Sequence, residues 1–357
     1  MTATQEDRTA PMDGLVSRLI ETPRLVAHLI EREAAAPRRT AVFVHGNVSS
    51  AVFWQPTMLG LPEDVRAVAI DLRGFGASSV LPVHATRGVR DFSDDVASVL
   101  DALETGPVEL IGWSMGAGVV MQLLLDRPEL VSGMTLVAPV SPYGFGGTAG
   151  PEGRLLREDC AGTGGGGANP AFVAAIAAGD RTADQAVSPR AVFRAAYVAP
   201  SAEPAVLEDL WVESMLTTAT GEDNYPGDAV AADGWPGFGP GRRGVLNTMA
   251  PCWFDVSAIA ESDVKPPILW VRGDADAIVS DTSLFDLNHL GALGAIPGWP
   301  GEDEAPAQPM IAQTRAVLAR YAANGGTYRE VTFAGCGHSP HLERPGAFLD
   351  ALVEHLG

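Results

Sequence analysis

Short runs of apolar, mostly β-branched residues alternate with longer amphipathic stretches in the first 140 residues. Such runs, buried on both faces, are typical of parallel strands. The stretches between them carry apolar residues at helical spacing, so one face of each helix can pack on a sheet. We predict strands within 40–46, 65–76, 107–114 and 132–140, and helices at 92–104 and 115–130. Regular alternation of strand and helix indicates an α/β fold with a doubly wound, mostly parallel sheet.

The same rhythm returns near the C-terminus. An apolar strand lies within 266–279, a helix covers 310–326, and a further strand and a closing helix follow. Near the N-terminus, residues 14–32 alternate apolar and polar positions around Pro23, which predicts an edge hairpin. The sheet domain is therefore predicted to consist of 14–141 and 266–357.

The pattern breaks between residues 142 and 265, where Gly, Pro and Ala dominate. Helical pieces occur at 171–178 and 204–219 without intervening strands, so we predict a mainly helical cap insertion with long loops. A second surface insertion is expected at 285–310. Residues 1–13 are polar, lack the apolar stretch of a signal peptide and are expected to form a disordered leader.

Composition narrows the possible partners. With 46% hydrophobic residues in 357, the chain can bury a large core. A net charge of −20 would repel nucleic acids and anionic membranes, so we expect neither as a partner. No apolar run reaches the roughly 18 residues that a spanning helix needs. Three cysteines without paired spacing favour a reducing compartment, and we expect a cytoplasmic protein. Its oligomeric state, a homodimer included, stays open.

Ser114 is the strongest candidate for chemistry. It lies in Gly112-Trp113-Ser114-Met115-Gly116, a G-x-S-x-G sequence between a predicted strand and a predicted helix. A serine at so sharp a turn is held in a strained conformation, and the glycines let neighbouring chain approach closely. Its hydroxyl would lie at the start of a helix, where the macrodipole favours developing negative charge.

In this motif and in three others described below, the chain resembles the serine hydrolases of the α/β-hydrolase fold, a superfamily that includes capped esterases and lipases. The resemblance covers about 14–141 and 266–357. It implies a nucleophile, an acid and a histidine in that chain order, with an oxyanion-hole loop upstream. His45-Gly46-Asn47 follows the first buried strand and is similar to that loop. The resemblance thus implies backbone N–H donors at Asn47 and Met115, and a structural role for His45.

The acid and the base follow from the same resemblance. Asp276 lies in Gly273-Asp274-Ala275-Asp276, which is similar to the family's G-x-x-D turn and selects Asp276 over Asp274. His338 lies in a C-terminal sequence, GCGHSPHLERP, that resembles the family's signature around the catalytic histidine. His341 is the only other histidine near enough in sequence to compete. The loop of residues 71–76 also resembles a recurrent family loop, with a mainly structural role.

A serine nucleophile with this triad predicts an acyl-enzyme route, with hydrolysis of a small carboxylic ester or lactone as the leading hypothesis. The loop after His45 is similar to that of haloalkane dehalogenases, but those enzymes need a carboxylate nucleophile. Amidase or aminopeptidase activity, C–C bond hydrolysis and cofactor-free perhydrolysis stay open on the same residues. A small-molecule receptor with little turnover is the alternative from another class. We expect no cofactor and no metal.

Substrate selection is expected to depend on the cap. Trp113, Trp211 and Trp253 are candidates for an apolar pocket wall, although such residues more often form a cap's own core. An aminopeptidase would need acidic groups to bind an ammonium. The cap offers Glu213, Glu222 and Asp223, for which a solvated surface is the simpler interpretation.

Overall fold

A computed structural model describes residues 9–200 and 206–357. The expected disordered leader therefore lies largely outside the described residues. No helix in these two ranges is long and apolar enough to cross a membrane.

The central element is an eight-stranded sheet with the order β1-β2-β4-β3-β5-β6-β13-β14. Only β1 and β2 run antiparallel to their neighbours, and every pairing from β4 to β14 is parallel. The predicted edge hairpin and doubly wound sheet are thus confirmed. The strands are β1 (Val16–Glu21), β2 (Val26–Arg32), β3 (Arg39–Val44), β4 (Val65–Ile70), β5 (Val108–Trp113), β6 (Val131–Val137), β13 (Ile268–Gly273) and β14 (Tyr328–Phe333).

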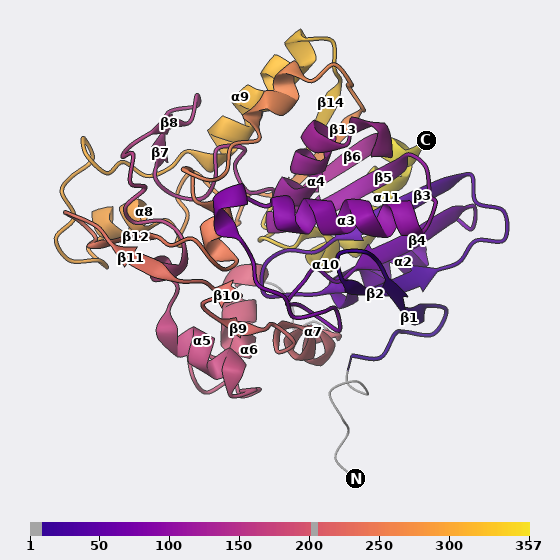
Figure 1. The fold of residues 1–357 in the computed structure, drawn as a ribbon, viewed down its shortest axis with the longest axis horizontal. Coiled ribbons are helices and arrows are strands. Elements are labelled where there is room, and N and C mark those ends of the chain that lie inside the picture. The colour runs from indigo at the N-terminus through magenta and orange to yellow at the C-terminus, as the bar shows by residue number, and fades with distance from the viewer. Residues whose placement is uncertain (1–8, 201–205) are drawn as a thin grey trace.

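Helices cover both faces of this sheet (Figure 1). On one face lie α3 (Arg90–Ala102) and α4 (Met115–Asp126), which contact each other. Behind the sheet in the same view lie α10 (Pro340–Glu343) and α11 (Pro345–Leu356), with α11 against α2 (Gln55–Gly60). The predicted helix at 310–326 is α9 (Met310–Ala323).

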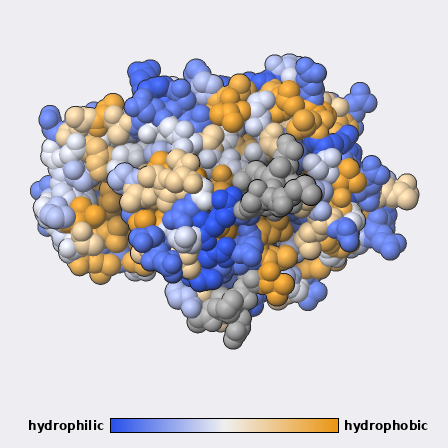
Figure 2. All heavy atoms as spheres, turned by 90° about the horizontal axis from the view of Figure 1, so that it is seen from below, coloured by the Kyte–Doolittle hydropathy of each residue, from blue (hydrophilic) through white to orange (hydrophobic). Residues whose placement is uncertain are grey.

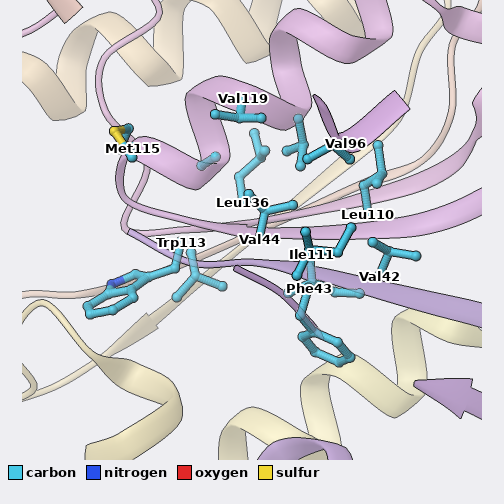
Figure 3. Packing of buried hydrophobic residues seen from close by; sticks show 14 of the residues in the cluster. Val42, Phe43, Val44, Val96, Leu110, Ile111, Trp113, Met115, Val119 and Leu136 are labelled. Carbon is cyan, nitrogen blue, oxygen red and sulfur yellow. The ribbon is translucent and has the colours of Figure 1, made fainter. Parts of the chain in front are cut away.

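The core forms where the central strands are buried on both faces. Successive side chains of a strand point to opposite faces, so Val42 and Val44 pack on one side and Phe43 on the other (Figure 3). Every residue of β5 is buried. The continuous apolar runs in the sequence therefore have the physical cause expected of parallel strands.

The segment between β6 and β13 is built differently. Its helices are short: α5 (Pro170–Ala177), α6 (Pro189–Val192) with one π-helical turn after it (Phe193–Tyr197), and α7 (Glu208–Met215). The sequence does not predict its three strand pairs, because each strand has only two or three residues. These pairs are β7 (Thr148–Ala149) with β8 (Arg154–Leu155), β9 (Thr220–Gly221) with β10 (Tyr225–Pro226), and β11 (Ala229–Ala231) with β12 (Phe238–Pro240). Its separation from the core as a cap stays a prediction.

The face that carries α5, α6 and α7 is seen in Figure 2. Hydrophobic residues lie there in several groups between hydrophilic ones. The second insertion contributes one short helix, α8 (Leu287–Ala292).

Candidate active site

Ser114 lies at the turn from β5 into α4. Its backbone has φ 56° and ψ −118°, a conformation that a residue with a side chain adopts only when its surroundings enforce it. Two glycines permit this turn. A Cβ on Gly112 would lie 2.4 Å from the Gly116 oxygen, and a Cβ on Gly116 would lie 2.4 Å from the oxygens of Val44 and His45. Both motif glycines are therefore required by close backbone approach.

The side chains of His338 and Asp276 meet although 62 residues separate them in the chain. His338 Nδ1 lies 2.8 Å from Asp276 Oδ2, and both residues are buried. The other carboxylate oxygen of Asp276 accepts hydrogen bonds from the N–H groups of Ile278 and Val279, at 2.7 and 2.9 Å. The carboxylate is thus fixed with one oxygen toward the histidine.

The neighbouring Asp274 has a different environment. It is exposed, and its Oδ1 accepts a hydrogen bond from the Gly335 N–H at 2.7 Å. It therefore links the ends of β13 and β14. Between the two carboxylates of the turn, Asp276 is the one in contact with His338.

His45 organises the loop after β3. Its Nε2 accepts a hydrogen bond from the Leu72 N–H at 3.0 Å, which leaves the proton on Nδ1. Nδ1 donates to the Gly46 oxygen at 2.7 Å, and the Ser49 hydroxyl donates to the same oxygen at 2.8 Å. Burial lowers the pKa of His45 and so favours its neutral form. Because the N–H of a trans peptide points opposite to its oxygen, these bonds also fix the direction of the Asn47 N–H.

The loop that begins with Asp71 ties this arrangement down. Asp71 accepts from the N–H groups of Ala51 and Ala77, at 2.7 and 2.9 Å, and its Oδ2 lies 2.7 Å from His28 Nδ1. Although burial alone would raise it, the pKa of Asp71 is lowered, with the hydrogen bond and charge of His28 as the main causes. A charged carboxylate therefore connects its own loop to β2 and to Ala51, at the far end of the loop that follows β3.

The loop lies directly beside the serine. A Cβ on Gly46 would be 3.1 Å from Ser114 Cβ and 3.2 Å from Trp113. Met115 is the first residue of α4, and the first N–H groups of a helix have no partner inside it. The Asn47 and Met115 N–H groups therefore belong to segments that flank Ser114 on two sides.

The loop of His338 is held by two further contacts. The Trp113 indole N–H donates to the His338 oxygen at 2.9 Å. The Glu343 carboxylate accepts from the N–H groups of Gly337 and Ala199, both at 2.8 Å. Glu343 thus joins the residue before His338 to the segment between β6 and β13.

A cavity of about 420 Å³ opens next to these residues. Ser114, His338, Trp113 and Asn47 all line it, together with residues from the ranges 140–249 and 278–290. Its volume lies within the range of roughly 300–1,000 Å³ that is typical of small-molecule sites. The serine, which is half-buried, and the histidine therefore face one shared space.

Comparison with known proteins agrees with the fold. A family model described as alpha/beta hydrolase fold matches residues 41–151. The carboxylesterase CesB (YbfK) of Bacillus subtilis superposes with a TM-score of 0.56 at 14% identity, covering 99% of this chain and 94% of that one. A putative aryl esterase of Burkholderia cenocepacia gives the same TM-score at 18% identity, covering 96% and 98%.

This chain has the alpha/beta hydrolase fold. Similarity in sequence to curated proteins covers shorter stretches. The chain is 39% identical over 89 residues to the putative carbamate hydrolase RutD of Variovorax paradoxus, which is 25% of this chain and 33% of that protein. It is 26% identical over 131 residues to a 2-(acetamidomethylene)succinate hydrolase of Mesorhizobium japonicum, covering 37% and 45%. The matches thus span a third to less than half of these relatives.

Of the three tryptophans expected at the pocket, the structure brings only Trp113 there. Trp211 of α7 packs with Phe53 and Phe193, at ring-centroid distances of 6.1 and 5.6 Å, where the segment between β6 and β13 meets the short helix that contains Phe53. Trp253 lies beside Gly88, whose Cβ would be 2.6 Å from the Trp253 oxygen. Neither Trp211 nor Trp253 lines the cavity.

His341, the competing histidine, is placed away from the serine. Its ring stacks on Trp54 at a centroid distance of 4.4 Å, and it is fully buried. Among the described residues, neither ring nitrogen has a hydrogen-bond partner. Burial holds the pKa of His341 well below its usual value. The ring behaves as part of the apolar core.

Two groups of pocket residues are missed by the sequence reasoning. Tyr197, after α6, lines the cavity and donates from its hydroxyl to the Asn47 oxygen at 2.8 Å. Four apolar residues at or beside the second insertion form another wall, namely Leu284, Phe285, Leu287 and Leu290. Their apolar spacing around α8 was the available signal, within a stretch interpreted only as surface. In the described ranges 9–200 and 206–357, no cluster of three His, Cys, Asp or Glu side chains could hold a metal ion.

Proposed function

We propose that this alpha/beta hydrolase is a serine hydrolase that cleaves a small carboxylic ester or lactone through an acyl-enzyme. One observation carries the proposal. Ser114, at its strained turn, faces the same cavity as His338, whose ring is paired with the buried Asp276. The chain order of serine, acid and histidine is that of this fold's hydrolases.

In the proposed mechanism His338 Nε2 takes the proton of Ser114 while Oγ attacks the carbonyl carbon of the ester. Asp276 holds Nδ1–H and stabilises the imidazolium that forms. The negative charge on the carbonyl oxygen would be bound by the N–H groups of Asn47 and Met115, each worth roughly 3–4 kcal/mol if lost. Collapse of the tetrahedral intermediate passes the proton to the leaving alcohol and leaves an acyl-Ser114.

Water completes the cycle. His338 removes a proton from a water molecule, whose oxygen attacks the acyl carbon. The second tetrahedral intermediate then releases the carboxylic acid and returns the proton to Ser114. A lactone would follow the same steps, with the alcohol and acid leaving as one hydroxy acid.

The surroundings of the serine favour an ester or lactone over an aminopeptidase substrate. An amine substrate would need a carboxylate to receive its ammonium, and the described cavity wall includes no acidic residue. Glu213 is paired with Arg181, while Glu222 and Asp223 are paired with Arg243. The acidic cap residues are therefore engaged elsewhere.

The names of the relatives suggest two further substrate classes to test. The putative carbamate hydrolase and the 2-(acetamidomethylene)succinate hydrolase point to carbamates and succinate derivatives. A succinate derivative carries two carboxylates, for which the described cavity wall offers no arginine or lysine. A neutral ester is thus the better match, while neutral carbamates and amides belong in the substrate panel.

The test compares wild type with Ser114→Ala on p-nitrophenyl acetate, butyrate and octanoate. We expect turnover by wild type and a loss of roughly 10⁶-fold in the variant if the triad acts as a unit. Circular dichroism should be the same for both proteins. Equal rates would sink the mechanism. A single burst of p-nitrophenol without turnover would instead support a receptor that keeps a reactive serine.

A further inference from the structure

We infer that the cavity at Ser114 selects esters that carry no charge on either side of the scissile bond, and that an apolar rim at residues 284–290 enforces this selection. This rests on the proposed function, because it describes the substrate of that same serine. The inference follows from what the cavity wall contains, how the rim is held and where the chain's own charges lie.

The wall is uncharged apart from the catalytic candidates. Among the described residues, it contains no aspartate, glutamate, lysine or arginine, and His338 is its only titratable group besides two tyrosines. Most of the remaining side chains are aliphatic or aromatic, such as Val140, Phe145, Phe172 and Met249. The cavity thus offers mainly apolar contact to a substrate and no oppositely charged side chain to an ion.

The two tyrosine hydroxyls do not supply a charge to the cavity wall. Burial raises the pKa of both Tyr197 and Tyr225, so the two phenols stay neutral. The Tyr197 hydroxyl is already used by the Asn47 and Val48 oxygens, at 2.8 and 3.2 Å. An ionised carboxylate or ammonium brought into this space would lose its hydration without gaining an ion pair, which is strongly unfavourable.

One side of the entrance is apolar as well. Leu284 and Phe285 line the cavity and are also 51% and 45% exposed, so they form part of its rim. Leu287 and Leu290 of α8 continue the wall inward. Large apolar side chains at a solvent boundary offer contact to an apolar substrate as it enters.

Hydrogen bonds connect this rim to the turn that carries Asp276. The Leu284 N–H donates to the Ala277 oxygen at 2.9 Å, directly after Asp276. The Ser283 hydroxyl donates to the Ile278 oxygen at 2.6 Å. On the other side, Asp286 accepts from the N–H groups of Asn288 and Gln308, at 3.1 and 2.7 Å. The one carboxylate in the rim is therefore buried in backbone contacts.

The net charge of −20 supplies a second reason why an anionic substrate would react slowly. Long-range repulsion is screened by salt, with a Debye length of about 8 Å at 0.15 M and 3 Å at 1 M. The free-energy cost of dehydrating an ion inside an apolar cavity depends much less on salt. Salt therefore separates the cavity's selectivity from the field of the whole protein.

The experiment uses two esters that differ only at the end of the acyl chain, p-nitrophenyl hexanoate and the mono-p-nitrophenyl ester of adipic acid. At pH 7.5 the second carries a carboxylate where the first has a methyl group. We expect kcat/KM to be about 100-fold lower for the adipate ester, at both 0.1 M and 1 M NaCl. If the difference between the two esters disappears at 1 M NaCl, the inference is overturned. It is also overturned if the two esters have equal kcat/KM at both salt concentrations.

Two variants test the rim. Phe285→Arg places a cation at the entrance, and Leu293→Arg places the same charge on a residue that is 61% exposed and outside the cavity wall. Phe285→Arg should raise kcat/KM for the adipate ester about fivefold and lower it for the hexanoate. Leu293→Arg should leave kcat/KM unchanged for both esters. The same response in both variants would contradict a role for the rim.

Ser114→Ala keeps this test distinct from that of the proposed function. Turnover of both esters that survives Ser114→Ala, or no turnover of either by wild type, would overturn the proposed function and this inference together. Serine-dependent turnover without charge selectivity would overturn the inference alone.

Discussion

The Tyr197 hydroxyl donates a hydrogen bond to the main-chain oxygen of Asn47, 2.8 Å away, from a residue 150 positions later in the chain. It connects the segment between β6 and β13 to the loop expected to bind the oxyanion. Tyr197 also lies near His338, with ring centroids 6.4 Å apart. The segment between β6 and β13 therefore holds the loop that carries Asn47 and also contributes to the cavity wall.

Removal of this hydroxyl by Tyr197→Phe should lower kcat on p-nitrophenyl butyrate about fivefold, since one hydrogen bond contributes roughly 1 kcal/mol. The aromatic ring stays in the cavity wall, so KM should change little. Tyr143→Phe is the control, because the Tyr143 hydroxyl accepts from Arg320 outside the cavity. A KM effect without a kcat effect would show that Tyr197 acts on binding only.

Asp276→Asn should reduce kcat about 10⁴-fold, because an amide nitrogen facing Nδ1 favours the wrong tautomer of His338. Its remaining oxygen can still accept from Ile278 and Val279, so the fold should persist. Asp274→Asn keeps an acceptor for the Gly335 N–H and should retain near wild-type kcat. Comparable losses in the two variants would reverse the assignment of the acid.

Gly46→Ala should lower kcat by about 10- to 100-fold, since displacements well below 1 Å at a catalytic group are costly. The added methyl would meet Ser114 Cβ at 3.1 Å and Trp113 at 3.2 Å, so the loop must shift. Gly346→Ala is the matched control, because its Cβ would meet nothing within 4 Å. Steady-state kinetics and melting temperatures of both variants separate a local shift from unfolding.

Acid should destabilise the protein through its buried neutral histidines. The pKa of His341 is lowered in the folded state, so below its unfolded value of about 6.5 the unfolded chain binds more protons. The contribution of neutral His341 to the free energy of unfolding is complete above that pH. It is lost as the pH falls, by up to about 1.4 kcal/mol per pH unit. His45 acts in the same direction.

His341→Phe removes one of these titrations and keeps an aromatic ring next to Trp54. The free energy of unfolding in urea, measured at pH 7.5 and 5.5, should fall less for this variant than for wild type. His84→Gln, at an exposed histidine, should leave the wild-type difference unchanged. An identical pH response in His341→Phe and wild type would rule out His341 as a source.

Much of the fold can be predicted from local pattern. The strands β3, β5, β6 and β13 are apolar runs because both faces of the sheet are covered, and α3 and α9 show helical spacing because only one face packs. The strands β7 to β12 are too short to leave a periodic signal. The second insertion was predicted only as surface, because apolar residues around α8 do not show from sequence whether they face a cavity.

The sequence by itself predicted a nucleophile turn, an acid turn and a histidine loop as separate motifs, because each needs a particular order of glycines and polar residues. Only the tertiary structure decided that Asp276 and His338 meet across 62 residues, and that the Tyr197 hydroxyl binds the loop that carries Asn47. It also decided that Trp211 and Trp253 pack away from the cavity while Leu284 and Phe285 line it. Apolar side chains bury against whatever surface the chain brings near, and that choice is made by packing over long sequence separations.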